Sequence, residues 1–187
     1  IQVLAPTKKS GTGVYQLNAL LQAALNPPAP GKKEIAYGET VFRTGDKVMH
    51  IRNNYQLPWK TDGGEEGEGV FNGDVGFVSA VDNQDRIVTV RFDDERTVEY
   101  DYQQLEELEL AYCLSVHKSQ GSEFPCVVMP VLGGPPRLLT RNLFYTALTR
   151  ARKLVVLVGR EDAIADMVRN NHIATRYTTL RQRLEEG

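Results

Sequence analysis

Residues 154–158 read LVVLV, a continuous apolar run that ends at Gly159. A short run without polar alternation is typical of a strand buried on both faces of a parallel sheet. Residues 126–132 (CVVMPVL) and 1–5 (IQVLA) have the same character. Segments with helical spacing lie between and after these runs. The sequence therefore predicts an α/β fold with a doubly wound parallel sheet.

Four segments have the spacing of helices. Residues 12–26 carry apolar side chains three and four positions apart and end at two prolines: Val14, Leu17, Leu20, Leu21, Ala24 and Leu25. This pattern predicts that the apolar side chains form the buried face of a helix. Residues 139–151 show the same pattern: Leu139, Leu143, Phe144, Ala147, Leu148 and Ala151. Residues 162–170 and 174–185 are also predicted to be helical.

The middle of the chain has a different composition. Residues 47–51 alternate as a strand does, whereas residues 60–69 (KTDGGEEGEG) are rich in glycine and acid and predict a mobile loop. Short alternating segments follow at 75–81, 86–92 and 97–100, separated by polar turns. Closely spaced hairpins of this kind favour a small SH3-sized β-barrel. We expect residues 1–65 and 109–187 to form the α/β domain and residues 66–108 to form the barrel insert.

The composition sets the class of protein. The chain has 187 residues, of which 41% are hydrophobic and 25% charged, as in globular proteins. A net charge of −2 excludes a polycationic coat but leaves a local basic face open. Cys113 and Cys126 lie in apolar runs and predict buried thiols, and the scattered histidines predict no metal site. No apolar run approaches a membrane span of about 20 residues.

The N-terminus shows no signal peptide, because Ile1 opens directly on a strand of core character. This start suggests a part of a larger protein. Together with the low cysteine content, it predicts a reducing, cytoplasmic setting.

Two polar segments carry a specific resemblance. Residues 115–124 read SVHKSQGSEF and residues 145–153 read YTALTRARK. They resemble motifs V and VI of superfamily 1 helicases, in the form of the RecD-like (exodeoxyribonuclease V alpha-subunit) family that moves 5′ to 3′. Residues 3–22 resemble its motif IV region, and residues 45–57 and 70–76 resemble its entry into an inserted barrel. The resemblance implies a RecA-like second motor domain (2A) interrupted by an SH3-like domain (2B).

The loop after residue 114 concentrates polar groups. A strand is predicted at residues 110–116, and at and after its end, where α/β proteins place their ligands, stand Ser115, His117, Lys118, Ser119 and Gln120. A helix N-cap explains one of these residues but not five. Hydroxyl, imidazole and amide groups bond phosphates and sugars without reading sequence. By resemblance, Ser115 and His117 contact single-stranded DNA. Lys118 and Thr7 are further candidates, and Ser115 keeps the hydroxyl of the family's usual threonine.

A second set of residues is expected at ATP. By resemblance, Glu123 bonds the ribose hydroxyls, Gly121 allows close backbone approach, and Arg150 is an arginine finger. Such a finger accelerates related NTPases by about 10³ to 10⁵, and arginine suits phosphate because its fork binds bidentately. Arg152 is a weaker candidate, with surface charge as the alternative. Three alternatives stay open for Lys8: a contact with the nucleotide, a contact with the DNA backbone, or exposure to solvent.

Amides and an aromatic ring follow the strand at 47–51, where Asn53, Asn54 and Tyr55 can meet bases. Residues 72–74 (NGD) are expected to be a plain turn at the barrel mouth.

The chain has no phosphate loop of the form G-x-x-x-x-G-K-[ST], and its Asp-Asp-Glu run at 93–95 lies in a predicted hairpin turn. It therefore supplies half of a composite site. ATP with Mg²⁺ is bound mainly by the first motor domain, and the chain alone is expected to be inactive.

The resemblance implies several partners: single-stranded DNA, a duplex junction, the N-terminal motor domain of the same protein and subunits of a nuclease–helicase complex, with no membrane. It also implies a bacterial, nucleoid-associated location. The helicase region of a conjugative relaxase and a non-catalytic DNA- or partner-binding module remain alternatives. Retention of Glu123 and Arg150 argues against the second. The acids of the insert leave a structural or protein-binding barrel open: Asp82, Asp85, Asp93, Asp94 and Glu95.

Overall fold

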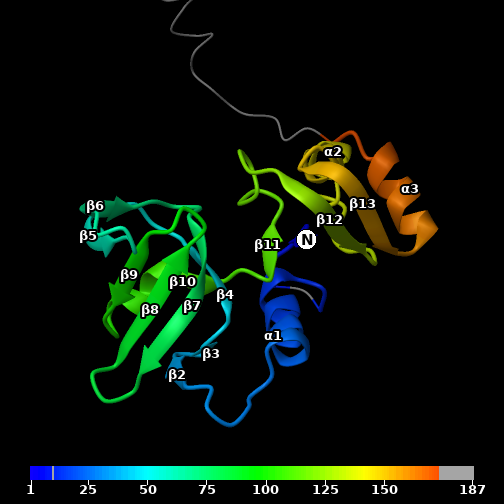
Figure 1. The fold of residues 1–187 in the computed structure, drawn as a ribbon. Coiled ribbons are helices and arrows are strands. Elements are labelled where there is room, and N and C mark those ends of the chain that lie inside the picture. The colour runs from blue at the N-terminus through cyan, green and yellow to red at the C-terminus, as the bar shows by residue number, and fades with distance from the viewer. Residues whose placement is uncertain (10, 173–187) are drawn as a thin grey trace, which may run out of the picture.

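A computed structural model of the protein describes residues 1–9 and 11–172 (Figure 1). A four-stranded parallel sheet has the order β11-β1-β12-β13. Its strands are β1 (Gln2–Ala5), β11 (Cys113–Ser115), β12 (Phe124–Val131) and β13 (Ala151–Gly159). The helices of this part are α1 (Val14–Leu25), α2 (Arg141–Leu148) and α3 (Glu161–Arg169). These elements lie close to the predicted segments.

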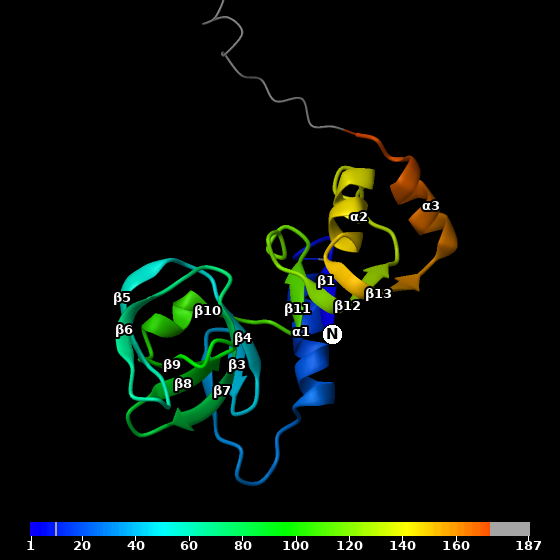
Figure 2. The ribbon, with the colours of Figure 1, turned by 45° about the horizontal axis from the view of Figure 1, so that its top comes forward.

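The helices cover opposite faces of the parallel sheet (Figures 1 and 2). α1 packs against Ala5 and Cys113, whereas the cluster that includes α2 and α3 contains the neighbouring residues Leu4 and Leu114. Because successive side chains of a strand point to opposite faces, the two clusters lie on the two sides of the sheet. The predicted doubly wound α/β class is confirmed.

The predicted buried face of α1 is correct only in part, because Val14 is buried and Leu17 and Leu21 pack beside it, but the other three apolar residues are exposed. Leu20 and Leu25 are 55% and 67% exposed, whereas Asn18 and Gln22 are buried. The Asn18 amide bonds both the N–H and the carbonyl of Cys113, at 2.8 and 2.9 Å. The helix therefore docks through these hydrogen bonds as well as through apolar packing, and hydrophobic periodicity does not detect the hydrogen bonds.

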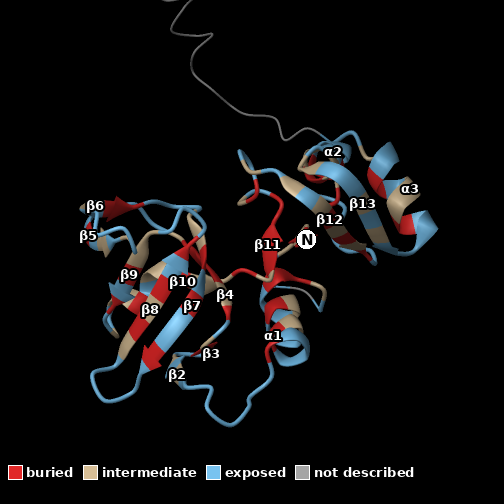
Figure 3. Cartoon of the chain, in the orientation of Figure 1, coloured by how far each residue is buried: buried red, intermediate tan, exposed pale blue. Residues whose placement is uncertain are grey.

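The second sheet is antiparallel and has the order β10-β4-β7-β8-β9-β5-β6. Its strands are β4 (Lys47–His50), β5 (Asn54–Lys60), β6 (Glu66–Val70), β7 (Val75–Asp82), β8 (Ile87–Phe92), β9 (Thr97–Tyr100) and β10 (Leu108–Leu110). A 3-10 helix, η1 (Gln104–Glu107), precedes β10, and a hairpin of β2 (Glu34–Tyr37) and β3 (Thr40–Arg43) packs nearby. Figure 3 shows buried and exposed residues alternating along these strands, as one-sided core packing requires.

The loop predicted at residues 60–69 is instead the β5–β6 hairpin. A Cβ at Gly67 would lie 2.5 Å from Trp59 Cζ2, so the glycine lets the indole ring lie flat on the neighbouring strand. The expected insert boundary at residue 66 cuts through this sheet, because β4 and β5 precede it and pair with later strands.

The strand predicted as buried at 154–158 is an edge strand. Leu154 and Val158 in β13 are 55% and 52% exposed. The predicted helix at 174–185 lies outside the described residues. No helix within residues 1–9 and 11–172 is long and apolar enough to cross a membrane.

Candidate nucleic-acid and nucleotide sites

A groove of about 860 Å³ lies where β1 and β11 end. Its walls come from the segment after β1, the turn at residues 72–74 and the loop after β11. The lining residues are Pro6, Thr7, Lys8, Asn72, Gly73, Asp74, Ser115, His117, Lys118, Gln120, Ser122 and Leu138. The structure thus brings together Thr7, Ser115, His117 and Lys118, the main DNA candidates of the sequence, and adds Lys8 to them.

The loop at residues 116–123 is held by its own hydrogen bonds. The Ser115 hydroxyl accepts from the Lys118 backbone N–H at 3.2 Å, and the fully buried Ser119 donates to the Val116 carbonyl at 2.8 Å. Ser119 is therefore structural. His117 and Gln120 are exposed on the same loop and line the groove, so solvent and a ligand in the groove can reach them.

Lys118 is tied to the barrel sheet. Its Nζ lies 2.7 Å from Glu109 Oε2, with the two side chains 23% and 29% exposed. Glu109 belongs to β10, so this ion pair joins the loop to the antiparallel sheet. The sequence analysis did not identify Glu109, because nothing in the local pattern places it beside residue 118.

The turn at residues 72–74 is a wall of the groove as well as a turn. Gly73 N–H donates to the His50 carbonyl at 2.9 Å, and His50 N–H donates to the Asp74 carbonyl at 2.8 Å. Asp74 also pairs with Arg96 at 2.7 Å. Only its position in the fold reveals this role, since the letters NGD alone indicate a turn.

The side chains of Asn53 and Asn54, which were predicted to contact bases, form hydrogen bonds within the protein. Asn53 Oδ1 accepts from the Asn72 N–H at 3.0 Å, and Asn54 Nδ2 donates to Glu107 Oε2 at 3.0 Å. Neither side chain lines the groove. Both amides hold the barrel and its turn in place.

The residues expected at ATP gather at the other end of the same loop. Arg150 Nη1 donates to the Ser122 carbonyl at 3.2 Å, and Phe124 N–H donates to the Arg150 carbonyl at 2.8 Å. Gly121 has φ +87°, in the left-handed region where a side chain is strained. These bonds place the start of β13 directly against the end of the loop.

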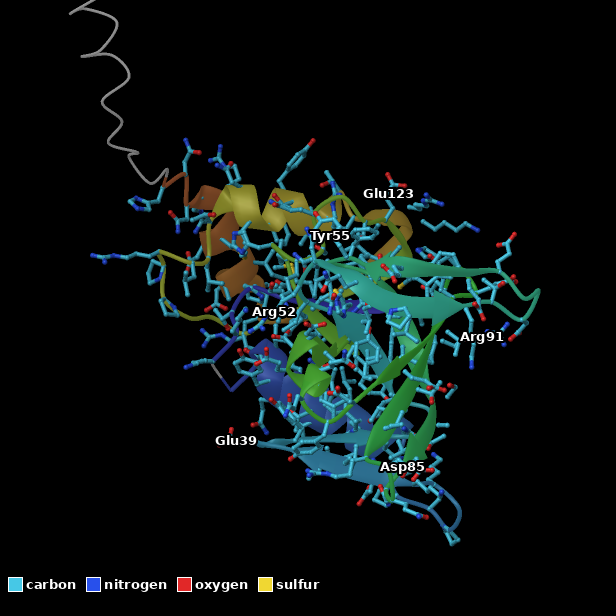
Figure 4. All side chains as sticks on the ribbon, turned by 90° about the vertical axis from the view of Figure 1, so that its left-hand side faces the viewer. Glu39, Arg52, Tyr55, Asp85, Arg91 and Glu123 are labelled. Carbon is cyan, nitrogen blue, oxygen red and sulfur yellow. The ribbon has the colours of Figure 1, made fainter. Side chains whose placement is uncertain are left out.

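The charges of the two arginines differ in their surroundings. Arg152 Nε lies 2.7 Å from Glu123 Oε2, and this pair is 66% and 53% exposed. Figure 4 shows Glu123 projecting at the surface. Within residues 1–9 and 11–172, no ion pair joins Arg150 to a carboxylate, and its head bonds carbonyl and hydroxyl oxygens. The Arg150 charge is therefore free to interact with an anion.

Comparison with known proteins gives the class first. Residues 110–158 match the UvrD-like helicase C-terminal domain, and residues 17–92 match the SH3 domain of the ATP-dependent RecD-like DNA helicases. The chain is thus a helicase C-terminal domain that carries an SH3 domain. Its family is that of the RecD-like helicases, as the motif resemblance predicted.

Named relatives agree with this assignment. The chain is 37% identical over 163 residues to the ATP-dependent RecD2 DNA helicase of Deinococcus radiodurans, covering 87% of this chain and 20% of that protein. It is 34% identical over 189 residues to the RecBCD enzyme subunit RecD of Mycobacterium tuberculosis, covering 98% and 28%. The chain therefore spans less than a third of these relatives.

Solved structures show the same fold. Bacteroides Pif1 helicase in complex with ADP-AlF3 and single-stranded DNA superposes with a TM-score of 0.58 at 19% identity, covering 98% of this chain and 44% of that one. Bacteroides Pif1 bound to single-stranded DNA gives a TM-score of 0.56 at 19% identity, covering 90% and 44%.

Proposed function

We propose that this chain is the C-terminal motor part of an ATP-dependent DNA helicase that moves 5′ to 3′. The observation that carries the proposal is the loop at residues 116–123. One end of it lines the groove with His117 and Lys118, and the other end bonds Arg150 through the Ser122 carbonyl. A single loop thus links a surface suited to a nucleic-acid backbone with a cation suited to a phosphate.

The groove suits the backbone of single-stranded DNA. It offers hydroxyl, imidazole, amide and ammonium groups from three chain segments, which bond phosphates and sugars without selecting a base. The Lys118 ammonium binds a phosphate while it remains paired with Glu109. The Pif1 structures that share this fold contain single-stranded DNA, which supports DNA as the partner.

In this proposal, ATP binds between this chain and the first motor domain of the same protein. The sequence has no phosphate loop, so ATP and Mg²⁺ are held mainly by that first domain of the same protein. Arg150 stabilises charge on the transferred phosphate, and Gly121 allows close backbone approach. Glu123 bonds the ribose once its ion pair with Arg152 has opened. Opening this pair costs little, because exposed ion pairs contribute about 0–1 kcal/mol.

We propose the division into domains on the basis of the two sheets. The parallel sheet with its helices corresponds to domain 2A, and the antiparallel sheet to domain 2B. Strand pairing favours an insert that begins at Lys47 over one that begins at residue 66. A duplex junction and the subunits of a nuclease complex complete the proposed partners, the latter because relatives are RecBCD subunits.

The test is DNA-stimulated ATP hydrolysis by the whole protein that contains this chain. Arg150→Ala should lower turnover by about 10³-fold while ATP binding is kept, and Arg150→Lys should recover only part of it. Arg91→Ala is the matched control, because Arg91 is exposed on the barrel and pairs with Asp62. Unchanged turnover in Arg150→Ala, or clear turnover by the 187-residue chain alone, would contradict the proposal.

A further inference from the structure

Two aromatic rings project into solvent from the barrel. Tyr55 is 69% exposed and Phe71 is 42% exposed. Their ring centroids lie 5.6 Å apart with an interplanar angle of 74°, an edge-to-face contact. Single exposed aromatics are ordinary on protein surfaces, but a paired, exposed set indicates a contact surface.

The backbone is shaped to present these rings. β5 and β6 shift register between Asn54 and Pro58, so Tyr55 lies in an irregularity of the pairing. Bulges of this kind re-aim a side chain away from the sheet. Gly69 has φ +108°, and a Cβ there would lie 3.2 Å from Phe71 Cζ. The glycine therefore leaves room for the Phe71 ring.

The rings lie next to the groove. Phe71 directly precedes Asn72, which lines it. The Phe71 N–H donates to Asp74 Oδ2 and the Asp74 N–H donates to the Phe71 carbonyl, both at 3.0 Å. This turn fixes the backbone of Phe71 relative to the groove wall. In Figure 4, Tyr55 lies toward the same end of the molecule as Glu123, whereas Asp85 lies at the opposite end.

We propose that Tyr55 and Phe71 form a stacking surface for the unpaired bases of a single strand whose backbone lies in the groove. The inference rests on the proposed function. Among the described residues that line the groove, none is Phe, Tyr or Trp, and the imidazole of His117 is the one flat ring, so the groove serves phosphates and sugars and offers bases little stacking area. Every base has a π-face, and stacking on a protein ring tolerates any sequence.

The local charge fits a nucleic acid better than the rest of the barrel does. Asn53, Asn54 and Gln56 flank Tyr55 with neutral amides. The nearby Arg52 pairs with Glu106, so that carboxylate is compensated. The acid-rich turn at 82–85 lies at the far end in Figure 4, away from Tyr55. The acids of that turn are therefore not beside Tyr55.

The experiment measures binding of a fluorescein-labelled oligothymidylate to the whole protein by fluorescence anisotropy, without nucleotide. Tyr55→Ala and Phe71→Ala should each weaken binding about tenfold, equivalent to about 1.4 kcal/mol. Tyr55→Phe keeps the ring and should bind like the unaltered protein. Phe77→Ala is the matched control, because Phe77 is 48% exposed on β7 of the same barrel. Circular dichroism checks that each variant is folded.

Three outcomes separate the inference from the function on which it rests. An abasic oligonucleotide should remove the difference between Tyr55→Ala and the unaltered protein, since no base remains to stack. If His117→Ala weakens binding but neither ring variant does, the stacking surface is wrong and the groove stands. If the unaltered protein does not bind the oligonucleotide at all, the proposed function fails first.

Discussion

Replacing Asp46 is expected to destabilise the contact between α1 and the barrel sheet. Asp46 is fully buried, and its carboxylate accepts four hydrogen bonds. Oδ1 accepts from Asn26 Nδ2 at 2.7 Å and from the Tyr112 hydroxyl at 2.9 Å. Oδ2 accepts from Gln22 Nε2 at 2.6 Å and from the Arg43 N–H at 2.7 Å. Residues far apart in the sequence therefore meet at one carboxylate.

The expected size of the effect follows from what each donor loses. Gln22 and Asn26 keep a second acceptor, the carbonyls of Val41 and Thr44. The buried Arg43 N–H has no such alternative among its described bonds. Hydrogen bonds to a charged group contribute about 1.5–3 kcal/mol each, and a buried unsatisfied donor costs about 1–3 kcal/mol. Two of the four donors keep another acceptor, so about half of the lost hydrogen-bond energy is recovered. Asp46→Ala should therefore lower the free energy of unfolding by about 3–5 kcal/mol.

Asparagine does not rescue this site. Each carboxylate oxygen accepts two bonds, so an amide in either orientation keeps two bonds and turns its NH2 group toward at least one N–H donor. Burial, and then Asp46 itself, raise the pKa of Tyr112 to about 12, so the hydroxyl remains a donor at neutral pH. Asp46→Asn should therefore be destabilising as well.

Thermal unfolding followed by circular dichroism measures the effect. A loss of about 3–5 kcal/mol corresponds to about 6 to 20 °C in Tm for a chain of this size. Glu39→Ala is the control, because it removes the same charge from an exposed position near the network. An Asp46→Ala midpoint within about 1 °C of the unaltered chain would refute the reasoning, since a buried four-donor carboxylate cannot be removed at no cost.

Two further predictions concern titratable groups. Burial lowers the pKa of His50 below its usual value. Below about pH 6.5 the unfolded chain binds a proton at His50, whereas the folded chain does not. Tm should therefore fall from pH 7 toward pH 5, and this dependence of Tm on pH should be weaker in His50→Gln. Burial also raises the pKa of the Cys113 thiol to about 12, whereas Cys126 is only partly buried. Iodoacetamide at pH 8 should therefore label Cys126 in the folded chain, and mass spectrometry that finds equal labelling of Cys113 would contradict the packing of α1 on β11.

The sequence by itself determined the elements and their class. Apolar runs predicted β1, β12 and β13, because strands of parallel sheets often carry continuous apolar side chains, although β13 proves to be a partly exposed edge strand. Helical spacing predicted α2 with its buried residues Leu143, Phe144 and Ala147. The motif-like segments at 3–22, 45–76, 115–124 and 145–153 together predicted the helicase class, because each is a local pattern and their order along the chain is specific.

The tertiary structure decided what depends on residues distant in the chain. Asn18 faces β11 because its amide meets the backbone of Cys113, a partner 95 positions away. Hydrophobic periodicity cannot contain that information. The loop predicted at 60–69 was misplaced for the same reason, since pairing across the sheet outweighs the local composition of glycine and acid. Strand pairing also favours an insert that begins before residue 66.

The candidate site divides in the same way. Sequence supplied Ser115, His117, Glu123 and Arg150 as candidates, and their roles stay predictions. Only the fold placed Glu109 against Lys118 and the 72–74 turn in the wall of the groove. The chemical type of a side chain can be read from the residue itself, whereas a groove forms between segments that chain folding brings together.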